Sequence, residues 1–131
     1  MRTISTLDDF HARVKSESPK LVVVDFFAEW CGPCKRVAPQ YAQLAEIHSK
    51  TACFVKVDVD ASPELSSFGR ISAMPTFQVW RAGEKLETLQ GAAEHKLTAL
   101  VEKFAGAPLP LPFEVALELP EGSCAAQTAQ R

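Results

Sequence analysis

The sequence of 131 residues lacks the features that mark several large classes of protein. It has no run of lysine or arginine, and 14 basic against 16 acidic side chains leave a formal charge of −2, which argues against a nucleic-acid partner. The longest apolar stretches, such as residues 21–24, are far too short to cross a bilayer, so no membrane span is expected. Residues 1–14 are polar and do not resemble a signal or transit peptide, which predicts a reducing, cytoplasmic location.

Cysteine is also scarce, with four in the chain. Cys31 and Cys34 form a single CxxC, whereas Cys53 and Cys124 show no obvious pairing pattern. The sequence has no second CxxC and no closely spaced histidine pair, so a set of four zinc ligands is missing and no metal is expected. The length predicts one compact domain that needs no disulfide to hold its core.

The position of the CxxC is more informative than its spacing. It follows residues 21–27, a nearly continuous apolar run typical of a buried strand, and it begins a helical stripe. Cys31 is therefore expected at a helix N-terminus, where unpaired N–H groups and the helix dipole favour a thiolate. Cys34 follows one turn later on the same face, within bonding reach. The stripe predicts that Cys34 is buried and Cys31 is at the exposed tip, and the pair indicates thiol–disulfide exchange.

Strand and helix patterns alternate along the chain in the order β-α-β-α-β-α-β-β-α. This order predicts an α/β fold, a mixed sheet covered by helices on both faces. Helical spacing or capping signals mark residues 6–14, 34–45, 63–68 and 97–104, and strand patterns mark residues 21–27, 53–59, 76–80 and 85–89. Ala82 and Gly83 separate the last two strands and predict a hairpin, and the last helix is expected to end near Gly106.

With the elements in place, residues 4–105 resemble thioredoxin over their whole length, in order and spacing as well as in motif. The matching segments are residues 24–26, 30–35, 56–60 and 74–77, with Gly91. The Met-Pro-Thr-Phe segment resembles eukaryotic-type thioredoxins more than bacterial ones. The resemblance implies a thioredoxin domain over residues 1–106.

The resemblance also implies an activity and its partners. Thioredoxins are protein-disulfide reductases that donate electrons to disulfide-containing protein substrates in cell redox homeostasis and electron transport. They bind no cofactor, and a thioredoxin reductase returns them to the dithiol state with electrons from NADPH. The same cycle is expected for this chain.

Each residue of the active-site segment receives a role on this reading. Cys31 is the expected nucleophile, and Cys34 is the thiol that resolves the mixed disulfide. Gly32 and Pro33 between them suit a helix start, where a missing N–H costs nothing, and the resemblance implies a reducing poise for this pair. Phe27 stands where many thioredoxins carry tryptophan, and because aromatic bulk is kept, catalysis is expected to survive.

Asp25 is the most unexpected residue, because it lies inside the apolar run of residues 21–27. Burial of a carboxylate disfavours its charged form, so the pKa of Asp25 is expected to rise. The functional interpretation is a proton acceptor for Cys34, acting through a water. The alternative is an acid paired with a lysine, and the resemblance makes Lys56 that neighbour. Lys56 is expected to modulate the electrostatics of the site, or else to hold its ammonium group in solvent.

A substrate-binding rim is expected around Cys31. Its predicted members are Trp30, Met74, Pro75, Gly91 and Ala92. The resemblance implies a cis peptide bond before Pro75, which leaves the backbone of Met74 free to hydrogen-bond an extended substrate strand. The alternative is that Trp30 and Met74 are ordinary core residues.

Residues 107–131 extend beyond the family domain. They begin with a proline-rich stretch, residues 108–113, that favours extended structure, and they end in a segment expected to be disordered or loosely packed. This tail leaves open a second class of function, a thioredoxin-like binding subunit or adaptor that docks a partner through residues 107–131. A third class, an oxidase or isomerase of an oxidising compartment, is disfavoured by Gly32 and Pro33 and by the missing signal segment.

Overall fold

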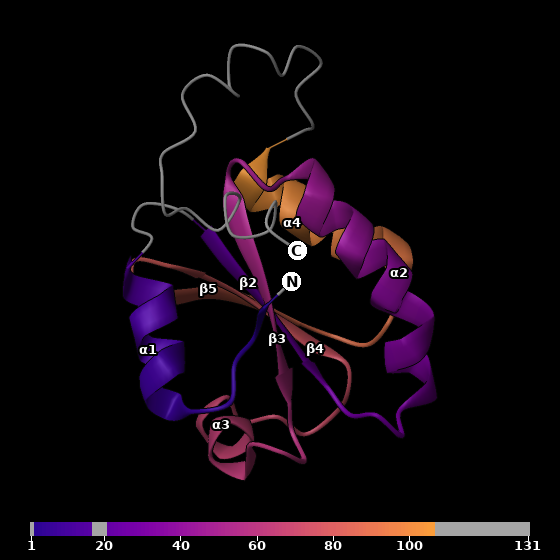
Figure 1. The fold of residues 1–131 in the computed structure, drawn as a ribbon. Coiled ribbons are helices and arrows are strands. Elements are labelled where there is room, and N and C mark those ends of the chain that lie inside the picture. Colours follow the sequence, from indigo (N-terminus) through magenta and orange to yellow (C-terminus); the bar gives the residue numbers. More distant parts are fainter. Residues whose placement is uncertain (1, 17–20, 107–131) are drawn as a thin grey trace.

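The computed structural model describes residues 2–16 and 21–106 (Figure 1). The predicted order of elements is confirmed. The elements are β1 (Arg2–Thr3), α1 (Leu7–Ser16), β2 (Leu21–Phe27), α2 (Gly32–Ile47), β3 (Ala52–Asp58), α3 (Pro63–Phe68), β4 (Thr76–Arg81), β5 (Glu84–Gln90) and α4 (Glu94–Ala105). The predictions for residues 107–131, including the docking tail and any role of Cys124, lie outside the described residues.

The five strands form one mixed sheet in the order β1-β3-β2-β4-β5. Strands β1, β3 and β2 are parallel, and β4 runs antiparallel to both β2 and β5. The central strand β2 reads as a continuous apolar run because helices cover both faces of the sheet, so its residues are buried whichever way they point. In this register Asp25 lies opposite Lys56 on one side and Phe77 on the other.

Two hydrophobic clusters fill the spaces on the two faces of the sheet. Figure 1 shows α2 and α4 together on one side and α1 and α3 on the other. The alternation of β2 divides its side chains between them, with Leu21 and Val23 packed under α2 and α4 and Val22 and Val24 packed against α1 and α3. Asp25 and Phe27 continue the first series, so they face the helix that carries the cysteines.

The α1 side of the sheet contains a cluster of aromatic rings. The Trp80 ring meets that of Phe10 edge to face at a centroid distance of 5.2 Å, and it stacks on Phe68 at 6.1 Å. The indole Nε1 of Trp80 donates to Oε1 of Gln78, so the polar atom of this buried side chain is satisfied. This cluster fixes the sheet from the face away from the cysteines.

Local signals in the sequence set the helix and turn boundaries. Thr6 caps α1 through its Oγ1, which accepts a hydrogen bond of 3.1 Å from the Asp9 N–H. Pro63 begins α3, where its missing N–H is harmless. The turn between β4 and β5 has positive φ at Ala82 (55°) and Gly83 (83°), as a two-residue hairpin loop requires.

Tyr41 ties α2 to the centre of the sheet. Its hydroxyl lies 2.9 Å from the Val23 carbonyl oxygen in β2 and 2.7 Å from the Val55 carbonyl oxygen in β3. The side chain is buried, so these bonds are shielded from water. The middle of α2 is therefore held against the centres of β2 and β3.

Candidate active site

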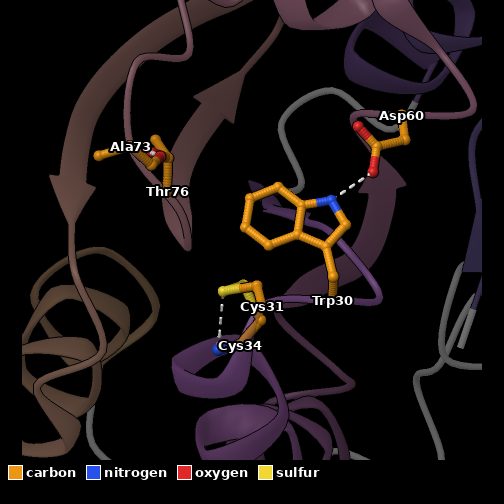
Figure 2. The surroundings of a disulfide bond; sticks show 6 residues. All are labelled: Trp30, Cys31, Cys34, Asp60, Ala73 and Thr76. Carbon is orange, nitrogen blue, oxygen red and sulfur yellow. Dashed lines mark hydrogen bonds between the residues drawn. A yellow bond between two sulfur atoms is a disulfide. The ribbon is translucent and has the colours of Figure 1, made fainter.

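Cys31 and Cys34 form a disulfide at the start of α2, with their Cα atoms 5.3 Å apart. Cys31 is the N-cap of the helix, with extended backbone, and its Sγ accepts a hydrogen bond of 3.2 Å from the Cys34 N–H (Figure 2). Gly32 and Pro33 occupy the first turn, where helix N–H groups have no partner within the helix. Once the disulfide is reduced, the same N–H and the helix dipole favour a thiolate at Cys31.

The prediction that Cys31 is an exposed tip was wrong. Cys31 is only 4% exposed and Cys34 only 5%, so both cysteines are almost equally covered. Ala28 forms a small buried cluster with them, and Phe27, Val59 and Met74 pack against it. These residues come from three separate parts of the chain, and a helical stripe within α2 contains no information about them.

Trp30 stands beside this covered disulfide and faces solvent. It is 68% exposed, and its indole Nε1 donates a hydrogen bond of 2.6 Å to Oδ2 of Asp60. Figure 2 shows the indole ring next to the sulfur atoms, with its nitrogen turned toward Asp60 in the loop after β3. Trp30 is therefore not a core residue, and an aromatic face is available next to Cys31.

The loop before β4 adds the next part of the surroundings. Met74 is partly buried and packs against the cysteines, and the Met74–Pro75 peptide bond is cis, as the resemblance implied. The hydroxyl of Thr76 donates to the carbonyl oxygen of Ala73, which closes the turn that leads to Pro75 (Figure 2). Apolar atoms of Met74 thus lie against the disulfide on the side of this loop.

Gly91, beyond the end of β5, completes this part of the site. Its N–H donates a hydrogen bond of 2.8 Å to the Pro75 carbonyl oxygen, so the two segments are joined directly. Its φ is +101°, a conformation that L side chains rarely adopt, and no atom lies within 4 Å of the place a Cβ would take. Ala92 is partly buried and packs against the core under α2 and α4. Gly91 therefore borders open space beside the cis proline.

Asp25 lies in β2, the strand that precedes the disulfide, and is 2% exposed. Burial raises the pKa of Asp25 from 3.8 to about 7, and the positive charge of Lys56 opposes this rise only in part. The expected rise in pKa is confirmed. Within residues 2–16 and 21–106, the Oδ1 atom of Asp25 has no hydrogen-bond partner and no ion pair joins its carboxylate to Lys56. The alternative of a simple ion pair is therefore not what these residues form.

Lys56 instead places its Nζ over the ring of Phe27, 4.5 Å from the ring centroid. Both side chains border a cavity of about 260 Å³, lined by Phe27, Ala28, Glu29, Cys34, Lys35, Ala38 and Lys56. Cys34 and Lys56 thus meet the same hollow, which has room for several waters at about 30 Å³ each. In the described part of the chain no three His, Cys, Asp or Glu side chains are placed to hold a metal ion.

Two residues with clear roles in this geometry were missed by the sequence interpretation. Asp60 fixes Trp30, yet an acid in an exposed turn after a strand gives no sign of a partner thirty positions earlier. Tyr41 anchors α2 to the sheet. Its position in the apolar stripe of the helix predicted a core residue and gave no sign that its hydroxyl contacts carbonyl oxygens of two strands. Both roles depend on contacts between distant segments.

A comparison with protein families settles the relationship of the chain to known proteins. The thioredoxin family model matches residues 2–103. The chain belongs to the thioredoxin family. Thioredoxin 1 of Plasmodium falciparum is 49% identical over 86 residues, which are 66% of this chain and 82% of that protein. Thioredoxin-1 of Drosophila melanogaster is 39% identical over 107 residues, which are 82% of this chain and 100% of that protein.

Solved thioredoxin structures agree with this assignment. A structure of Plasmodium falciparum thioredoxin superposes with a TM-score of 0.74 at 39% sequence identity, covering 79% of this chain and 99% of that one. The thioredoxin fold and the disulfide at the start of α2 occur together in this chain. The protein is therefore a thiol–disulfide oxidoreductase that acts through Cys31 and Cys34. No helix within residues 2–16 and 21–106 has the length and apolar character to span a membrane.

Proposed function

We propose that Cys31 is the nucleophile that reduces disulfides of protein substrates and that Cys34 resolves the resulting mixed disulfide. One observation carries this assignment. The Sγ atom of Cys31, and not that of Cys34, receives the N–H at the start of α2, so a thiolate is favoured at Cys31. The disulfide drawn in Figure 2 is then the oxidised product of one turnover.

The reaction proceeds by two exchanges of sulfur partners. The Cys31 thiolate attacks one sulfur of the substrate disulfide, forms a mixed disulfide with it and expels the other sulfur as a thiolate. Cys34 then loses its proton and attacks the Sγ atom of Cys31, which forms the Cys31–Cys34 disulfide and releases the second substrate thiolate. Two electrons pass from the enzyme dithiol to the substrate, and the substrate thiolates take up protons from water.

Asp25 is the proposed acceptor of the Cys34 proton. With a pKa of about 7, close to half of the Asp25 carboxyl groups are ionised at neutral pH. The ionised form is then available and is basic enough to accept a proton from a thiol. A water in the cavity beside Cys34 and Lys56 would carry the proton, because Asp25 lies opposite Lys56 in the register of β2 and β3. Lys56 modulates the charge of Asp25 without taking the proton itself.

The surface around Trp30, Met74, Pro75, Gly91 and Ala92 is the proposed substrate-binding rim. An exposed indole and the partly buried Met74 side chain offer apolar contact, while the open space beside Gly91 leaves room for a backbone. An extended segment of a substrate protein fits such a surface, because its main chain supplies hydrogen bonds and its side chains alternate in direction. We expect the rim to recognise unfolded or loop segments that carry a disulfide.

The reducing electrons are expected to come from NADPH through a thioredoxin reductase, with no cofactor bound to this chain. Its family membership and its Gly-Pro pair between the cysteines support this source, since both suit a reductant of a reducing, cytoplasmic compartment. Electron transport to target proteins and redox homeostasis follow from the same cycle.

Insulin reduction by dithiothreitol tests the assignment. The wild-type protein is expected to accelerate the reaction strongly, and Cys31→Ser is expected to fall to the rate of dithiothreitol alone. Cys34→Ser is the matched control, because it keeps the nucleophile and should accumulate a mixed disulfide with insulin that mass spectrometry detects. A Cys31→Ser variant that traps insulin through Cys34, or one that retains the wild-type rate, would overturn the assignment of Cys31 as the nucleophile.

A further inference from the structure

The contact between Lys56 and Phe27 is not explained by the reaction scheme. On the face of the sheet under α2, Lys56 has two neighbours in β2, because Asp25 lies directly opposite it and Phe27 lies two positions further along the same face. An ammonium group with a buried carboxylate beside it would be expected to turn toward the carboxylate. Instead it lies 4.5 Å from the centroid of the Phe27 ring.

The two possible positions of the ammonium group compete. A cation over an aromatic ring is attracted by the negative face of the ring, which is enough to hold a lysine at one of two similar sites. An ammonium group against the carboxylate would instead stabilise ionised Asp25. Among the residues that the structure describes, no ion pair between Lys56 and Asp25 is formed and Oδ1 of Asp25 has no partner. The Lys56 ammonium group therefore contacts the Phe27 ring and not the Asp25 carboxylate.

We propose that Phe27 is a positioning residue, whose ring holds the Lys56 ammonium group over the cavity and away from a direct ion pair with Asp25. The proposal rests on the function proposed for Asp25, the proton acceptor of Cys34. Holding the cation at a distance keeps Asp25 basic enough to accept a proton, whereas a direct pair would leave a stable carboxylate with little affinity for one. Phe27 thus acts on the reaction through Lys56 and touches no reacting atom.

The other groups around Asp25 leave Lys56 as the main adjustable charge. From α2, the Tyr41 hydroxyl faces this space, but its bonds to two backbone carbonyls fix it, and burial raises its pKa well above the ordinary value, so it stays neutral. From β4, the neighbour in register is the uncharged Phe77. Glu29 and Lys35, of opposite charge, line the cavity together with Lys56.

The test is an NMR titration of the Asp25 carboxyl group in the oxidised protein, where Cys31 and Cys34 do not titrate. Phe27→Leu keeps apolar bulk but removes the aromatic face, so the titration midpoint is expected to fall by about 0.5–1 pH unit as Lys56 moves to Asp25. Phe27→Trp is the matched control, and because it keeps an aromatic face, its midpoint should not fall. Phe27→Met serves as a second variant without a ring if Phe27→Leu does not fold.

A double substitution separates a specific effect of Lys56 from a general change in burial. In a Lys56→Met background no ammonium group is left to move, so adding Phe27→Leu is expected to leave the Asp25 midpoint where it was. An unchanged midpoint in both Phe27→Leu and Phe27→Met overturns the proposal. An equal fall with and without Lys56 also overturns it, since the ring would then act only by covering Asp25.

The same variants show whether the positioning matters to the reaction. The pH profile for resolution of the mixed disulfide is expected to move in the same direction as the Asp25 midpoint in Phe27→Leu. If the midpoint moves while the pH profile stays in place, Phe27 still positions Lys56, but Asp25 is not the base. The two proposals therefore fail separately.

Discussion

The two sides of the Cys31–Cys34 disulfide have opposite surroundings. On the outer side, formed by Trp30, Met74, Pro75, Gly91 and Ala92, every residue except the buried Pro75 is exposed or partly buried, and single hydrogen bonds hold two of the segments. On the inner side, formed by Asp25, Phe27 and Lys56, Lys56 and Phe27 line a small cavity with Cys34, and the buried carboxyl group of Asp25 lies opposite Lys56 in the sheet.

Under the proposed function, this difference separates substrate recognition from proton transfer. Changes on the outer side alter contacts with a substrate that is absent for most of the cycle, so they should affect binding and leave stability almost unchanged. Changes on the inner side alter a buried charge, so they should affect both the resolution step and the free energy of unfolding. Substitutions on one side that change only substrate binding, or only the resolution step and the free energy of unfolding, test whether the two sides act separately.

Among substitutions that keep both cysteines, the largest kinetic effect is expected for Asp25→Asn. This variant removes the proposed base but keeps a side chain of similar shape, and general bases typically contribute at least about 10²-fold to a rate. Resolution of the mixed disulfide should slow by roughly that factor at neutral pH, while the first attack by Cys31 keeps its rate. Single-turnover release of the two substrate thiols separates the steps, and equal slowing of both would show that Asp25 acts on Cys31 as well.

The same variant is expected to be more stable than the wild type above neutral pH. Because burial raises the pKa of Asp25 from 3.8 to about 7, the folded protein keeps a proton that the unfolded chain loses, so the free energy of unfolding falls as the pH rises through this range. The cost reaches at most about 4 kcal/mol above pH 7 and is absent below the unfolded pKa.

Urea denaturation of the oxidised protein measures this effect. Asp25→Asn should remove most of the slope between about pH 4 and about pH 7. Above this range it should be more stable than the wild type by on the order of 2 kcal/mol, because a buried amide still costs part of the gain. Trp30→Ala is the control and should keep the wild-type slope. A wild-type protein whose stability rises over this range would contradict the inner-side assignment.

On the outer side, Trp30→Ala is expected to weaken the binding of protein substrates and to raise their KM about fivefold, equivalent to about 1 kcal/mol of lost binding free energy. Its melting temperature should stay near that of the wild type, because the side chain is 68% exposed. Rates with a small-molecule disulfide, which does not reach across the rim, are the internal control. A comparable loss for small and protein disulfides would place Trp30 in the chemistry and break the comparison.

The smallest effect is expected for Asp60→Ala. It removes the acceptor for the indole N–H of Trp30, and a net loss of about 0.5 kcal/mol is typical of an exposed hydrogen bond, so KM should rise by about two- to threefold. Asp60→Asn keeps an acceptor oxygen and should restore most of the difference. If Asp60→Ala lowers KM for protein substrates, a fixed Trp30 hinders binding.

The sequence predicted those parts of the structure that depend on neighbours along the chain. The apolar run of β2, the proline start of α3 and the Ala82–Gly83 turn each gave an element at the right place. The raised pKa of Asp25 was also predictable, because a carboxyl group inside a continuous apolar run is buried on either face of a sheet.

Contacts between distant segments could not be predicted in the same way. The cover over Cys31 comes from Val59 and Met74, whose approach depends on the loops after β3 and before β4. The position of Lys56 over Phe27 depends on the register between β2 and β3, and a shift of one residue would put the two side chains on opposite faces of the sheet. Sequence spacing alone determines neither.

The placement of the two tryptophans gives this protein a built-in pair of optical reporters. Trp30 is exposed beside the disulfide, while Trp80 is 8% exposed on the opposite face of the sheet and is enclosed by Phe10 and Phe68. A disulfide quenches a neighbouring indole, and a solvated indole emits at longer wavelength than a buried one. A change at the red edge of the emission spectrum should therefore follow oxidation and reduction, and a shift of the blue component should follow unfolding, in one unlabelled sample.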